Sequence, residues 1–122
     1  MTLPFADQVA LIIPAADEPA PDEVRCWVQD NLAAVAPVPR LRAALVAEEL
    51  VGNARVHGVP PFVLRVAAGP GRSALRVFVE DCAAHGGRWR SGGGLALVDG
   101  LSRGWGVELR AGAKTVWAEV GL

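Results

Sequence analysis

Three polar side chains follow one another at four-residue intervals, Glu49, Asn53 and His57. Residues spaced in this way lie in one row along a helix. A carboxylate can orient or deprotonate a nucleophile, and an amide oxygen one turn later can ligate Mg²⁺. The same spacing also fits a solvated helix edge, with His57 near the helix end. Both interpretations stay open on the row alone.

The helix that carries this row is predicted from about Arg40 to Val56, with Gly58 as its C-terminal stop. On a helical wheel, small and branched apolar residues lie on either side of Leu50. This core stripe consists of Ala43, Val46, Ala47 and Ala54. Glu48, Gly52 and Arg55 fall on the opposite side, and the polar row runs along the border of the stripe.

The remaining elements follow from apolar runs and from the glycines and prolines between them. A helix is expected from Pro21 to just before Pro37. A second, short helix is expected over 95–101. Strands are expected at 9–13, 62–66, 74–79, around 107–109 and at 114–120.

The order β-α-α-β-β-α-β-β predicts an α+β fold, a two-layer α/β sandwich with helices on one face of a mixed, mostly antiparallel sheet. We expect residues 1–122 to form one domain. In the last strand Val116, Ala118 and Val120 alternate with Thr115, Trp117 and Glu119, as in a half-buried strand. Four side chains are expected on the face away from the helices, namely Arg76, Phe78, Trp117 and Glu119.

Composition limits the classes of function. Twelve Lys and Arg against thirteen Asp and Glu give a net charge of −1, and the basic residues are scattered. Nucleic-acid binders normally show a basic excess, so no nucleic-acid partner is expected. Two cysteines are too few for a disulfide framework, and no apolar run approaches the length of a membrane span. These features predict a reduced, cytoplasmic protein that is not bound to a membrane.

Four segments resemble the motifs of the histidine-kinase-like ATPases, also called the GHKL or Bergerat fold. Residues Glu49–Gly58 (ELVGNARVHG) resemble the N-box, and Val77–Asp81 resembles the strand whose terminal aspartate binds the adenine amino group. Residues Gly92–Val98 resemble the G-x-G-L box, whose backbone N–H groups hold phosphate. Residues 105–108 and 113–119 resemble the closing segment of the actinobacterial anti-sigma-factor serine/threonine kinases.

This resemblance implies a role for each matching residue. Glu49 would be the general base, Asn53 would ligate Mg²⁺ with the nucleotide, and Asp81 would bind adenine. The nucleotide-binding residues would be completed by Gly92, Gly94, Leu95 and Thr115. The implied cofactors are ATP and Mg²⁺, and the implied partner is a sigma factor or an anti-anti-sigma factor. A homodimer is also expected from the resemblance.

The segment after Asp81 departs from the family pattern. Ala83 stands where a glycine is usual, and the lid between Asp81 and the G-x-G-L box is short. These departures predict weak nucleotide binding and favour a regulatory role through protein contact. The alternative is an active serine/threonine kinase that phosphorylates an anti-anti-sigma factor. A metal or Cys–His site built from Cys82, His85 and His57 lacks the ligand spacing of a zinc site.

Overall fold

The computed structural model describes residues 8–15, 19–69, 73–82, 93–110 and 112–122. Their order along the chain is β-α-α-β-β-α-β-β, as predicted. The elements are β1 (Gln8–Ile13), α1 (Pro21–Asn31), α2 (Pro37–His57), β2 (Phe62–Ala68), β3 (Ala74–Asp81), α3 (Gly93–Leu101), β4 (Gly104–Arg110) and β5 (Ala113–Gly121).

The five strands form one sheet in the order β1-β2-β3-β5-β4. Every pair of neighbouring strands in the described residues is antiparallel. The sheet was predicted to be mixed and mostly antiparallel, and these residues contain only the antiparallel part of that prediction. The reason is the position of β5. The strands β3 and β4, which α3 connects, run in the same direction, but β5 lies between them and pairs with both.

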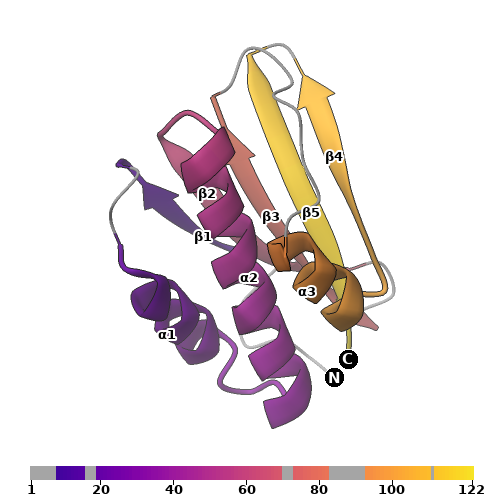
Figure 1. Ribbon diagram of the computed structural model, residues 1–122. Coiled ribbons are helices and arrows are strands. Elements are labelled where there is room, and N and C mark those ends of the chain that lie inside the picture. The colour runs from indigo at the N-terminus through magenta and orange to yellow at the C-terminus, as the bar shows by residue number, and fades with distance from the viewer. Residues whose placement is uncertain (1–7, 16–18, 70–72, 83–92, 111) are drawn as a thin grey trace.

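The helices cover one face of this sheet, as predicted (Figure 1). Along β5 the side chains alternate between buried and half-buried positions, because successive residues of a strand point to opposite faces. In the register, Arg76 pairs with Glu119 and Phe78 with Trp117, and all four are half-buried. These residues lie on the face away from the helices, which confirms the prediction.

The helix α2 lies centrally on the sheet, between α1 and α3 (Figure 1). It begins at Pro37, which suits a first helical position because proline has no N–H to leave unpaired. The predicted core stripe is buried, and so are Ala44 and Val51. Burial extends beyond one stripe because α2 packs against the sheet and against a helix on each side.

The helix α1 is shorter than predicted. It ends at Asn31, and Leu32 leaves the helical conformation with φ −109° and ψ 25°. The Asn31 side chain donates a hydrogen bond of 2.8 Å to the carbonyl of Trp27, and the chain then turns toward α2. Leu32 and Val35 are buried in this turn. Their apolar side chains therefore pack into the core although the helix does not continue through them.

Candidate functional site

The polar row predicted on the central helix is present, since Glu49, Asn53 and His57 all belong to α2. Glu49 and Asn53 are half-buried, one turn apart, and His57 is the exposed last residue of the helix. The Asn53 Nδ2 atom is buried and makes no hydrogen bond to any described residue. The neighbouring Glu48 points elsewhere, with its Oε2 atom 3.6 Å from Nε of Arg25 on α1.

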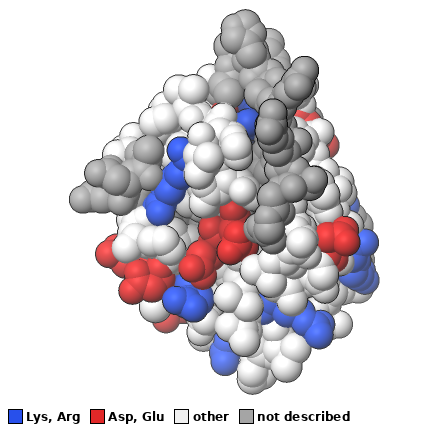
Figure 2. Space-filling view, viewed as in Figure 1, with Lys and Arg blue, Asp and Glu red and all other residues white. Residues whose placement is uncertain are grey.

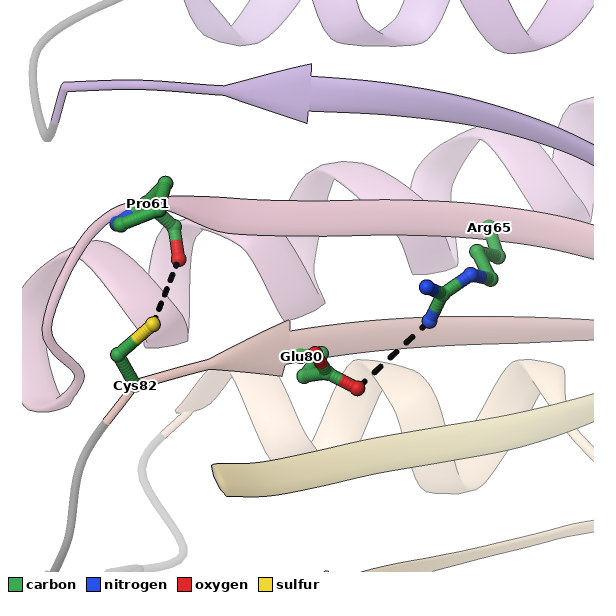
Figure 3. Close-up of polar contacts among 4 residues, drawn as sticks. All are labelled: Pro61, Arg65, Glu80 and Cys82. Carbon is green, nitrogen blue, oxygen red and sulfur yellow. Dashed lines mark hydrogen bonds and ion pairs between the residues drawn. The ribbon is translucent and has the colours of Figure 1, made fainter. Parts of the chain in front are cut away.

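The end of β3 packs against the end of α2. A Cβ atom on Gly58, which follows α2, would lie 2.6 Å from Oδ2 of Asp81. The Cys82 N–H donates a 3.0 Å hydrogen bond to the carbonyl of Val59. The Cys82 thiol lies 3.8 Å from the carbonyl oxygen of Pro61 (Figure 3). These contacts hold Asp81 beside the C-terminal end of the helix that carries the polar row.

Asp81 is paired with a lysine inside the protein. Lys114 is the strand partner of Asp81, and its Nζ atom lies 3.5 Å from Asp81 Oδ2. The side chain of Lys114 is 0% exposed and that of Asp81 is 2% exposed. Burial of an ion pair requires each charge to compensate the other, because the interior solvates neither. Lys114 therefore acts as the counter-ion of the buried carboxylate.

Lys114 was not among the predicted site residues, although the alternation along the last strand contained the signal. Alternate residues of a strand point to the same face. Lys114 is therefore on the helix-covered face, together with the buried Val116 and Ala118. Lysines are rarely buried without a partner, so this position predicts a buried carboxylate nearby. Asp81, at the end of a neighbouring strand, is that partner.

Thr115 lies on the other face of the sheet from Asp81. Its strand neighbours are Glu80 on β3 and Glu108 on β4. The structure therefore does not bring Thr115 together with Asp81 and the polar row. The residue of β5 that lies beside Asp81 is Lys114.

The glycine-rich segment is described only in part. Gly92 lies outside the described residues, as do Ala83, His85 and the predicted lid. Gly94 belongs to the first turn of α3, which begins at Gly93. Leu95 is 3% exposed and is thus buried in the core. Its side chain serves packing in this structure.

The α2 residues and Asp81 differ in how well they suit Mg²⁺ and a nucleotide. Glu49 and Asn53 supply carboxylate and amide oxygens, which are suitable ligands for Mg²⁺. Among the described residues no group of three His, Cys, Asp or Glu lies close enough to hold a metal by itself. Asp81 does not fit the role of a free acceptor for adenine, because Lys114 engages its carboxylate within the core. The residues on α2 therefore suit a Mg²⁺–nucleotide complex, whereas Asp81 does not suit the adenine base.

The surface around α2 carries mixed charge. Figure 2 shows acidic side chains gathered near the middle of the helix-covered face, with basic side chains at separate positions around them. No continuous basic surface is visible among the described residues on this face. The described helices include none that is long and apolar enough to cross a membrane.

Comparison with solved structures decides the fold. One match is the structure of the RsbU and RsbW domains of Rv1364c from Mycobacterium tuberculosis, with a TM-score of 0.71, 20% identity and coverage of 96% of this chain. Another is the histidine kinase domain of the blue-light activated histidine kinase from Erythrobacter litoralis EL346, with a TM-score of 0.53, 25% identity and 70% coverage. This chain has the histidine-kinase-like ATPase (GHKL) fold.

The GHKL assignment agrees with the fold implied by the sequence motifs. The chain spans 32% of the first matched chain and 45% of the second. No family model matches the sequence, and no curated protein matches it either. The likeness in structure therefore extends further than any likeness in sequence.

Proposed function

We propose that this GHKL domain is a regulatory module that acts by binding a sigma factor or an anti-anti-sigma factor. The observation that carries the proposal is the closed ion pair between Asp81 and Lys114. A domain whose expected base-binding carboxylate is already paired in the core is better suited to protein contact than to nucleotide turnover. The matched RsbW domain, which stands beside an RsbU domain in one protein, supports a role among protein partners.

A second candidate function is an active serine/threonine kinase for an anti-anti-sigma factor. It is favoured by Glu49 and Asn53, which lie one turn apart on α2 and are half-buried. In this mechanism the Glu49 carboxylate accepts the proton of a serine hydroxyl on the partner. A general base typically contributes about 10²–10⁴-fold to a rate and little to docking.

One paired assay separates the two functions. The protein is incubated with purified sigma factors and anti-anti-sigma factors of its source organism and labelled MgATP, and both complex formation and labelled phosphate on the partner are measured. For a binding module, Glu49→Ala leaves complex formation unchanged, and no phosphate is transferred by either protein. Glu48→Ala is the matched control, because this neighbouring carboxylate contacts α1.

The two results that count against the proposal are distinct. Phosphate transfer that the wild type performs and Glu49→Ala loses establishes the kinase. The absence of a complex with either class of partner contradicts both functions. The homodimer stays a prediction, for which light scattering of the purified protein gives the mass.

A further inference from the structure

The buried lysine beside Asp81 has a consequence for ligand binding. The Oδ2 atom of Asp81 is enclosed from two sides, by Lys114 Nζ at 3.5 Å and by the backbone at Gly58. No atom the size of a methyl group fits between Gly58 and this oxygen, since an added Cβ would lie at 2.6 Å from it. The whole Asp81 side chain is 2% exposed, so a donor from outside reaches it only when its present neighbours, among them the Lys114 ammonium group, move away.

The ammonium group of Lys114 and the amino group of a purine are both donors that suit a carboxylate. An ionised carboxylate only accepts hydrogen bonds, and a lysine ammonium only donates them. An exocyclic amino group of a purine is likewise a donor. It is neutral, however, and competes poorly for a buried carboxylate with a full positive charge that already lies beside it.

We propose that Lys114 is a built-in competitor for the nucleotide base, and that this residue sets the nucleotide affinity of the domain. The inference goes beyond the proposed function: the resemblance to the GHKL motifs places the nucleotide base at Asp81, and the ion pair with Lys114 opposes its binding there. With Lys114 removed, the carboxylate loses this charged neighbour, and the amino group of adenine can take the vacated place. Hypoxanthine carries a carbonyl group in place of the exocyclic amino group of adenine, so it lacks this amino donor.

The test is calorimetric titration of MgATP and MgITP into the wild type and two variants. Lys114→Met removes the charge and keeps much of the side-chain length. Lys114→Thr is the second variant, because it places a neutral hydroxyl group at the strand position paired with Asp81 and threonine is well suited to a strand. It keeps the test valid if loss of the lysine charge beside the buried carboxylate prevents Lys114→Met from folding.

We expect each variant to bind MgATP at least about tenfold more tightly than the wild type, and to prefer MgATP to MgITP. Adding Asp81→Asn to either variant should remove the gain. Arg65→Met is the matched control, since Arg65 pairs with Glu80 at 3.7 Å on the open face of the sheet (Figure 3). It should leave nucleotide affinity unchanged.

Two results would overturn the inference. One is wild-type affinity for MgATP in the micromolar range with Lys114 in place. The other is folded Lys114 variants that bind MgATP no better than the wild type. Partner binding is measured separately, as a complex that forms without nucleotide, so failure of the inference and failure of the proposed function are distinguishable.

Discussion

Gly58 is required by its surroundings more than by its backbone angles. Its φ of −106° is accessible to any residue, so the helix end does not demand glycine for its conformation. A Cβ atom here would instead lie 2.6 Å from Asp81 Oδ2 and 2.8 Å from the Ala54 carbonyl oxygen. Gly58 therefore permits the close packing of α2 against the end of β3.

We predict that Gly58→Ala destabilises the protein by about 1–3 kcal/mol, because the new methyl group overpacks a rigid contact. The measurement is the free energy of unfolding in urea. Gly52→Ala is the control, since no atom lies within 4 Å of its added Cβ. That change should stabilise α2 by roughly 0.5–1 kcal/mol. Equal effects of the two substitutions would contradict the packing argument.

The sequence was most informative at positions where residue type and spacing agreed. The row of Glu49 and Asn53 follows from helical periodicity, and the structure contains it. The Asp81–Lys114 pair could not be fully predicted, because residues 33 positions apart become neighbours only once the strand order is known. Thr115 was assigned by resemblance alone, whereas strand parity places it on the open face.

At the scale of elements, the edge strand β4 is held against β5 by a side chain that crosses the strand boundary. Trp117 on β5 is the register partner of Gly106 on β4. A Cβ atom on Gly106 would lie 2.9 Å from the indole Nε1 atom. The indole of Trp117 therefore lies over the backbone of β4 on the face that the helices leave open.

We expect Gly106→Ala to lower the free energy of unfolding by about 1–3 kcal/mol, because the indole must move away from β4. The near-ultraviolet circular dichroism of the tryptophans should change with it. Gly104→Ala, on the same strand and face, has no atom within 4 Å of its added Cβ and should leave both measurements nearly unchanged. Loss of stability in both variants would indicate a general intolerance of β4 to side chains.

The elements themselves were largely predictable, because their apolar runs are long and clearly bounded. The exceptions have local causes. Asn31 ends α1 through a side-chain hydrogen bond, although the apolar spacing continues to Val35. The sheet was expected to be mixed, and the insertion of β5 between β3 and β4 makes its pairings antiparallel. Strand order depends on contacts between distant segments, which periodicity does not report.

At the scale of the whole molecule, one continuous core joins the layers. It contains buried residues from all three helices and from the strands β1, β2, β3 and β5, and Trp105 of β4 packs against it. Since no element has a core of its own among the described residues, none is expected to unfold independently.

We predict a single cooperative unfolding transition in urea, as is usual for domains of this size. Tryptophan fluorescence and far-ultraviolet circular dichroism should give the same midpoint, because both follow the loss of the one core. Two separate midpoints would show that part of the chain, such as α1, melts before the sheet.

The position of β5 has a consequence for synthesis on the ribosome. The strand β4 is made before β5, yet β5 is its only neighbour in the described sheet. Lys114, the counter-ion of Asp81, also belongs to β5. A nascent chain that has emerged only as far as residue 110 thus has β4 without its strand neighbour and Asp81 without the lysine charge beside it. The domain becomes complete only when β5 leaves the exit tunnel and inserts between two strands that are already made.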